Sequence, residues 1–252
     1  MTLKLSFGII AEEQRLCQKH KKEYTSRMFL RNDGSEYWSG CPTCHDEEER
    51  EKRRQEQIQE QIAYKQRLIA RLFKQSAIPP RFESDTFDNY IADTTDKLTV
   101  KNTMLQFANE IDANLKLGRN VILAGNPGNG KTHLSVATAK VAIDKTHTAL
   151  FTTVGEMIDK INEAGWNKAT AIDNYTVPDL LILDEVTYTL NNEEQKNLFK
   201  VINKRYEQVR STIIQTNLPM ADLKNVLGER IIDRLRENGG VVLYFTWESY
   251  RK

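Results

Sequence analysis

The sequence lacks any apolar run that approaches the roughly 20 residues needed to cross a membrane, so a membrane span is not expected. It also lacks net charge, because 36 Lys and Arg against 35 Asp and Glu leave only +1 at pH 7. Any nucleic-acid site must therefore be a local basic patch. The first ten residues show no cleavage-site pattern, and we expect a cytoplasmic protein.

Cysteine is scarce: there are three, all before residue 45. An odd number without an export signal argues against disulfides and for a metal site or free thiols. Two-residue spacing lets both members of a Cys/His pair face one metal, and three cysteines with one histidine are a recognised structural Zn²⁺ set. We predict a closed structural zinc site at Cys17, His20, Cys41 and Cys44. His45 in place of His20, or three unrelated thiols, are the alternatives.

Residues 46–76 predict one charged helix, which opens on the acidic run Asp46–Glu49 and ends before Pro79. Apolar residues recur along it at helical spacing, namely Ile58, Ile62, Ile69, Leu72 and Phe73. This stripe fits either a solvated linker helix or a helix that binds a partner. We place the domains at residues 1–45, 46–77 and 78–252.

Beyond residue 80 the pattern alternates between strands and helices. Short apolar runs predict strands at 120–124, 149–154, 180–183 and 212–215, with a helix at 132–143. Strands that alternate with helices predict an α/β fold with a parallel sheet covered on both faces.

A complete phosphate-binding loop follows the first of these strands and precedes the helix. Its glycines let backbone N–H groups surround the phosphates of ATP, its lysine can reach the β- and γ-phosphates, and its threonine can ligate Mg²⁺. The loop consists of Gly125, Asn126, Pro127, Gly128, Asn129, Gly130, Lys131 and Thr132.

Polar residues follow two later strands. Asp184 and Glu185 end the apolar run 180–183, so Asp184 would hold Mg²⁺ and Glu185 would polarise the attacking water. Asn217, after the run 212–215, could orient that water. Arg230 and Arg234 are four residues apart, so one helix face carries both. They fit an arginine finger for a neighbouring subunit, or surface ion pairs.

From about Arg81 onward the chain resembles the AAA+ ATPase module of the bacterial DnaC/DnaI-type replicative helicase loaders. The resemblance rests on the phosphate loop continued through His133 and Leu134, on Leu183–Glu185, on residues 227–234, and on the ending Phe245–Arg251. The N-terminal Cys/His pairs are similar to the zinc-bearing adaptor of DnaI and of phage loaders, and this mixture suggests a phage-type loader.

The resemblance implies an AAA+ core with a reduced C-terminal lid. It implies ATP, Mg²⁺ and Zn²⁺ as cofactors, with His133 and Arg251 beside the nucleotide. Asn217 matches the family's first sensor, Arg251 its second, and Arg234 its arginine finger, with Arg230 a nearby candidate. The N-terminal region would bind the hexameric replicative helicase. The ATPase modules would assemble into a spiral or ring around single-stranded DNA.

Two features bear on the DNA part. Residues 196–252 contain 11 Lys and Arg against 6 Asp and Glu, a local excess of 11 − 6 = +5. Residues 155–178 include Trp166, Lys168 and Tyr175, which suit base stacking and phosphate contact. Packing of both aromatics into the core is the alternative.

Three other functions compete with the loader. An IstB-type transposition helper has a similar ATPase module, but the zinc pairs and the ending favour the loader. A small-molecule P-loop kinase is disfavoured by Glu185 and by the paired arginines. A non-hydrolysing zinc adaptor that uses ATP as a switch is disfavoured by Glu185.

Overall fold

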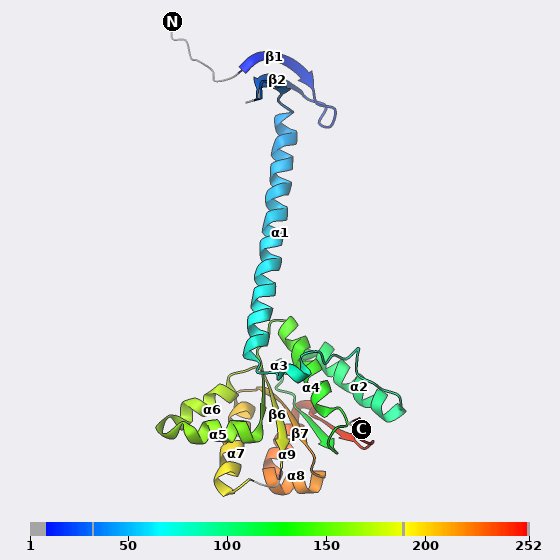
Figure 1. The fold of residues 1–252 in the computed structure, drawn as a ribbon, viewed down its shortest axis with the longest axis vertical. Helices are drawn as coiled ribbons and strands as arrows, with labels where there is room; N and C mark the ends of the chain where they lie inside the picture. Colours follow the sequence, from blue (N-terminus) through cyan, green and yellow to red (C-terminus); the bar gives the residue numbers. More distant parts are fainter. Residues whose placement is uncertain (1–8, 32, 188–189, 251–252) are drawn as a thin grey trace. The chain divides into compact units, whose positions relative to one another are not determined.

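The computed structural model describes residues 9–31, 33–187 and 190–250 (Figure 1). The chain forms two compact units, Met1–Lys65 and Gln66–Lys252, and the boundary between them falls inside one long helix. Within the described ranges, no helix is both long and apolar enough to cross a membrane.

The N-terminal unit is a small antiparallel sheet followed by the start of a helix. Its strands lie in the order β1 (Ile9–Leu16), β2 (Glu23–Leu30) and β3 (Glu36–Trp38). The Asp33 carboxylate accepts hydrogen bonds from the backbone N–H and the hydroxyl of Ser35, at 2.9 and 2.6 Å, and so closes the turn before β3. Among described residues 9–65, three are buried: Cys17, Ser26 and Cys41.

Helix α1 (Pro42–Gln75) begins before the predicted start at Asp46, because the segment that carries Cys44 already forms its first turn. Ile58 and Ile62 are 38% and 45% exposed, whereas Leu72 is buried in the core of the C-terminal unit. The predicted apolar stripe therefore divides into an exposed part and a part that packs.

The C-terminal unit alternates helices with strands, as the sequence predicts. Its elements are α2 (Thr95–Asn109), α3 (Ile111–Lys116), β4 (Val121–Gly125), α4 (Lys131–Asp144), β5 (Ala149–Thr153), α5 (Val154–Glu163), α6 (Lys168–Thr176), β6 (Leu180–Val186), α7 (Asn192–Glu207), β7 (Ser211–Thr216), α8 (Met220–Leu227), α9 (Glu229–Arg236) and β8 (Val241–Phe245). From Thr246 to Tyr250 the described chain forms no helix.

The five strands form one parallel sheet in the order β5-β6-β7-β4-β8. The α/β fold and its parallel sheet are confirmed, and the structure adds an unpredicted edge strand, β8. Because all five strands are parallel, their carboxyl ends lie at one edge of the sheet.

Two apolar cores cover the two faces of this sheet. Side chains alternate along β7, so Ile213 belongs to the core that includes residues of α2 and α4, while Ile214 belongs to the core with α5, α7, α8 and α9. Strands buried on both faces require continuous apolar runs. This explains why these strands could be predicted from apolar runs in the sequence.

One large polar side chain, Arg205 of α7, is fully buried beside the sheet. Its guanidinium donates to the carbonyls of Tyr175 and Pro178, at 2.9 and 2.8 Å, and to the Thr212 hydroxyl at 3.0 Å. Burial lowers the pKa of Arg205 to about 9, so the group remains charged at neutral pH. It satisfies carbonyls at the end of α6 that the apolar core could not.

Candidate functional site

The carboxyl edge of the sheet bears a cleft of about 480 Å³. The loop after β4 lies on one side of it, while residues from the ends of β6 and β7 lie on the other. The predicted residues that line this cleft together are Pro127, Gly128, Gly130, Lys131, Thr132, His133, Asp184, Glu185 and Asn217. The structure thus gathers the phosphate loop, the acidic pair and the amide at one place.

The glycines of the loop stand where larger residues would not fit. A Cβ at Gly125 would overlap the Phe245 carbonyl, and one at Gly130 would lie 2.6 Å from the Tyr90 ring. Gly130 also has φ +94°, a conformation that favours glycine. The loop is therefore shaped by β8 and by the segment before α2, as well as by its own sequence.

The Lys131 ammonium lies inside the loop. It donates to the carbonyls of Gly125 and Asn126 at 2.6 and 2.8 Å, and to the Asn129 side-chain oxygen at 3.2 Å. This places a cation at the N-terminus of α4, where the helix dipole already favours anions. The loop therefore offers N–H groups and a positive charge, a donor set that fits a polyphosphate.

Two of the predicted nucleotide-binding residues, Asn129 and His133, are held by contacts with neighbouring segments. Asn129 is fully buried, and its amide donates to the Phe245 carbonyl at 2.7 Å. His133 lines the cleft, but its ring nitrogen lies 2.7 Å from the Thr86 carbonyl. Asn129 thus holds the loop to β8, and His133 holds α4 to the preceding segment.

Asp184 is the carboxylate nearest the loop. Its Oδ2 accepts a hydrogen bond from the Thr132 hydroxyl at 3.1 Å, and its Oδ1 accepts one from the Glu185 N–H at 2.8 Å. Burial raises the pKa of Asp184, a cost that a bound cation would offset. A hydroxyl and a carboxylate side by side are the oxygen ligands that Mg²⁺ prefers, so this pair fits the predicted magnesium ligands.

Glu185 has a left-handed backbone, with φ +61°. Strand β6 pairs Leu183 with Ile214 and then Val186 with Thr216, so Asp184 and Glu185 together oppose a single residue of β7. This β-bulge turns the exposed Glu185 into the cleft. A left-handed conformation at a residue other than glycine costs about 1–3 kcal/mol and is concentrated at functional sites.

The C-terminal segment holds the phosphate loop through hydrogen bonds to two of its backbone carbonyls. The Trp247 indole N–H donates to the Asn129 carbonyl at 2.9 Å, and the Tyr250 N–H donates to the Gly128 carbonyl at 2.8 Å. The sequence flagged this ending only through its resemblance to a family, and these loop contacts were not anticipated. Arg251, the predicted second sensor, lies outside the described residues.

The predicted arginines lie on α9, away from the cleft of their own chain. Arg234 donates to the Asn203 side chain and stacks over the Tyr206 ring at 4.9 Å, whereas Arg230 is exposed. Neither arginine is among the described residues that line the cleft. α9 therefore presents them on a surface that does not include their own nucleotide site.

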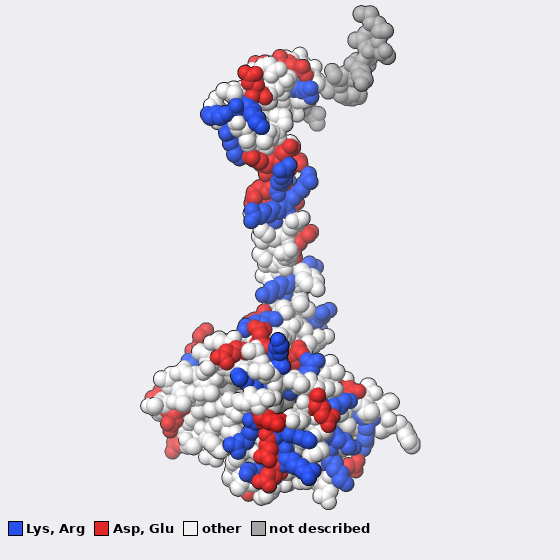
Figure 2. All heavy atoms as spheres, turned by 180° about the vertical axis from the view of Figure 1, so that it is seen from behind, with Lys and Arg blue, Asp and Glu red and all other residues white. Residues whose placement is uncertain are grey.

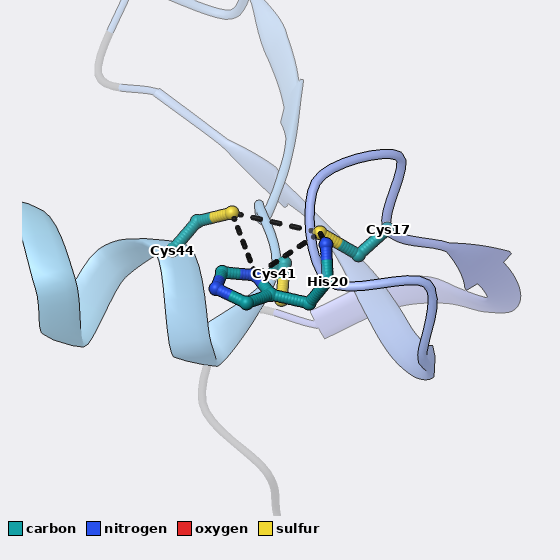
Figure 3. A group of neighbouring side chains, drawn as sticks. All are labelled: Cys17, His20, Cys41 and Cys44. Carbon is teal, nitrogen blue, oxygen red and sulfur yellow. Dashed lines mark hydrogen bonds between the residues drawn. The ribbon is translucent and has the colours of Figure 1, made fainter.

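Figure 3 shows the four predicted metal ligands converging in the N-terminal unit. The sulfurs of Cys17 and Cys44 are 3.6 Å apart, and His20 Nδ1 is 3.4 Å from each. In a zinc tetrahedron with Zn–S bonds near 2.3 Å, two sulfurs lie about 3.8 Å apart, so this geometry fits the ion. The alternative ligand His45 points instead toward Glu49, 3.5 Å away.

Glu47 of α1 completes the cluster, and the sequence analysis did not single it out. Its carboxylate lies 2.9 Å from His20 Nε2 and also binds the Lys19 ammonium. This contact directs Nδ1 of the histidine toward the sulfurs. The hydrogen bond that the His20 backbone N–H donates to Cys17 is the main cause that lowers the pKa of this thiol to about 6. Metal binding needs thiolates and a neutral imidazole. An ion bound here would therefore displace protons from His20, whose pKa the Glu47 contact raises to about 9, and from Cys44, whose pKa the Cys17 contact raises to about 11.

The two aromatic residues of segment 155–178, which we considered for DNA contact, differ in exposure. Tyr175 is buried at 5% exposure, as the core-packing alternative expected, whereas the Trp166 side chain is fully exposed between α5 and α6. Lys168 pairs with Glu193 at 2.9 Å. Figure 2 shows basic and acidic side chains interspersed over the visible face of the C-terminal unit rather than a uniformly basic surface. Trp166 is therefore the side chain of this segment most available for stacking.

Comparison with known proteins agrees with this arrangement. The family described as "IstB-like ATP binding protein" matches residues 51–252. The replicative helicase loader DnaC of Escherichia coli K12 is 27% identical over 188 residues, which cover 73% of this chain and 76% of the relative. DnaC of Buchnera aphidicola from Baizongia pistaciae is 30% identical over 190 residues, with the same coverage.

Solved structures show the same fold. The crystal structure of the DnaC helicase loader superposes with a TM-score of 0.60 at 24% identity, covering 66% of this chain and 99% of that one. The structure of DnaI gives 0.58 at 17% identity, covering 69% and 95%. The chain therefore belongs to the family of IstB-like ATP-binding proteins, together with the DnaC-type AAA+ helicase loaders that it matches over 73% of its length.

Proposed function

We propose that this protein is an ATP-driven loader that binds the hexameric replicative helicase and places it on single-stranded DNA. The observation that carries the proposal is the cleft in which Lys131, Asp184, Glu185 and Asn217 meet, on a chain whose relatives are named replicative helicase loaders. An IstB-type transposition helper is the alternative that shares the ATPase module. The zinc cluster and the DnaC relatives favour the loader.

Five residues of the cleft would take part in ATP hydrolysis. The loop N–H groups and Lys131 would bind the phosphates, while Thr132 and Asp184 would hold Mg²⁺, whose charge neutralises the phosphate oxygens. Glu185, exposed in the cleft, would accept a proton from the attacking water, and Asn217 would orient that water. Burial of Asp184 and exposure of Glu185 suit a metal ligand and a base, respectively.

The active site is proposed to be shared between subunits. A phosphoryl-transfer site gains from a further cation that stabilises the charge on the transferred phosphoryl group, and α9 holds Arg234 outside its own cleft. Its guanidinium lies against Asn203 and Tyr206 of α7, outside the cleft of its own chain. Delivery to a neighbouring subunit's cleft therefore fits this placement, and it requires the protein to assemble into a spiral or ring.

The zinc cluster is proposed to stabilise a small adaptor that binds the helicase. With three buried residues among positions 9–65 that the structure describes, this unit lacks the apolar core that stabilises larger domains. A bound Zn²⁺ ion would contribute the missing folding free energy. Because all four ligands come from the protein, the ion would be structural.

Glu185→Gln should leave ATP binding intact but slow hydrolysis by about 10²–10⁴-fold, because only the water-activating carboxylate is lost. Lys131→Ala, which removes a phosphate ligand, should instead abolish ATP binding. Equilibrium binding of a fluorescent ATP analogue and steady-state phosphate release separate the two effects. Hydrolysis by Glu185→Gln at the wild-type rate would exclude Glu185 as the base.

Arg234→Ala should bind ATP but hydrolyse it roughly 10³–10⁵-fold more slowly. Mixed with Lys131→Ala, it should regain activity, because its intact loop can receive Arg234 from the Lys131→Ala neighbour. The mixture is compared with each protein alone and with the same mixture diluted until assembly is lost. If the co-assembled mixture stays inactive, Arg234 acts within its own chain, and Arg230 is tested next in the same design.

Freshly purified protein should contain one Zn²⁺ per chain, and Cys41→Ser should release it. Metal analysis by mass spectrometry measures the ion. Helicase capture should weaken while ATP affinity stays unchanged, because the metal and the nucleotide bind to separate units. Thr43→Ala, an exposed neighbour between the same two cysteines, is the matched control. Wild-type protein that carries no zinc before any chelator treatment contradicts the site.

The loader function itself is tested with the hexameric replicative helicase of the host. The helicase should be captured by this protein, and ATP and single-stranded DNA should alter the complex. Trp166→Ala should weaken binding of single-stranded DNA by about 1–3 kcal/mol, the contribution of one stacked base, while helicase capture persists. Val177→Ala removes another exposed apolar side chain near α6 and serves as control. Capture of a transposase but no helicase would favour the IstB-type alternative.

A further inference from the structure

Beside the ladder pair Val186 and Thr216, a buried hydroxyl links the ends of β6 and β7. Thr216, at 1% exposure, donates from Oγ1 to the Val186 carbonyl at 2.8 Å and accepts the Leu218 N–H at 3.0 Å. Val186 directly follows Glu185, and Leu218 directly follows Asn217. The hydroxyl therefore bridges the chain just beyond both residues that would act on the water.

The need for such a bridge follows from the bulge. Ladder hydrogen bonds normally fix the register of neighbouring strands, but a bulge interrupts the ladder and leaves its extra residue unpaired. Here the interruption falls on Asp184 and Glu185, and Glu185 has the left-handed φ of +61°. A backbone in that conformation persists only where surrounding contacts impose it.

We infer that Thr216 is a positioning residue for ATP hydrolysis, which fixes the Glu185 bulge and the Asn217 loop in one register. Its donated bond holds the bulge from the C-terminal side, while the Thr132–Asp184 bond holds it from the loop side. Its accepted bond fixes the start of the turn that carries Asn217. Thr216 is buried and is not among the described residues that line the cleft, so its effect is on geometry.

This inference rests on the proposed ATPase function and makes a separable prediction. Thr216→Val keeps the shape of the side chain but removes the hydroxyl. Its kcat should fall about 10²-fold, the scale of a displacement near 1 Å in a catalytic group, with ATP affinity unchanged. Thr216→Ser, which restores the hydroxyl, should recover most of the rate. In a Glu185→Gln background, Thr216→Val should cause little further loss, because the group that it positions is already absent.

The matched control is Thr138→Val, which removes an equally buried hydroxyl that bonds the Leu134 carbonyl within α4 at 2.8 Å. Its kcat should stay within about twofold of wild type. Equal loss in both valine variants, or no rescue by serine, overturns the inference and leaves Thr216 as a packing residue.

Amide hydrogen exchange keeps the test independent of turnover. Exchange at Leu218 should accelerate in Thr216→Val and stay unchanged in Thr138→Val, because only the former removes the acceptor of that N–H. Unchanged exchange at Leu218 overturns the inference. If wild-type protein binds ATP without hydrolysing it, the proposed ATPase function fails, and the exchange result alone then decides whether Thr216 couples the two strand ends.

Discussion

The parallel alignment of β4, β6 and β7 is the constraint on which the site depends. Three strands that point the same way must end at the same edge, so each can deliver one part of the site without a long loop. β4 delivers the phosphate loop, β6 the acidic pair and β7 the amide. The two apolar cores, one on each face, stabilise this alignment. The edge itself is left free for polar groups that could not be buried inside.

Charge and strain at this edge are compensated by hydrogen bonds from the adjoining elements. Lys131 is surrounded by loop oxygens, Asp184 is bonded to Thr132, and the left-handed Glu185 is followed by the carbonyl that Thr216 holds. Hydrogen bonds also compensate a charge inside the C-terminal unit, where the buried Arg205 guanidinium donates to backbone carbonyls. Neighbours therefore fix the direction of each of these polar groups, and they would stiffen the geometry proposed for catalysis.

Features of the structure could be predicted from the sequence where the residues that form them lie close together along the chain. Apolar runs, the glycine loop and the Cys/His spacing are local patterns, and the four predicted strands, the loop and the ligand cluster were found from them. Glu47 was hidden in an acidic run, because only the fold brings it against His20. Thr216 fell just outside the predicted strand 212–215 and carried no signal, since the role inferred for it arises from a bulge in the neighbouring strand. Helix α1 starts at Pro42, before the predicted start at Asp46, because the segment between Cys41 and Cys44 forms its first turn.

The two units reach stability by different means, and this difference bears on how they can work together. The C-terminal unit has two apolar cores, one on each face of its sheet. The N-terminal unit has three buried residues among its described positions, two of them proposed metal ligands. Loss of the proposed zinc ion should therefore unfold the N-terminal unit while leaving nucleotide binding in place. Under the proposed loader function, the helicase contact would change through this one small unit, while the register of β6 and β7 would remain undisturbed.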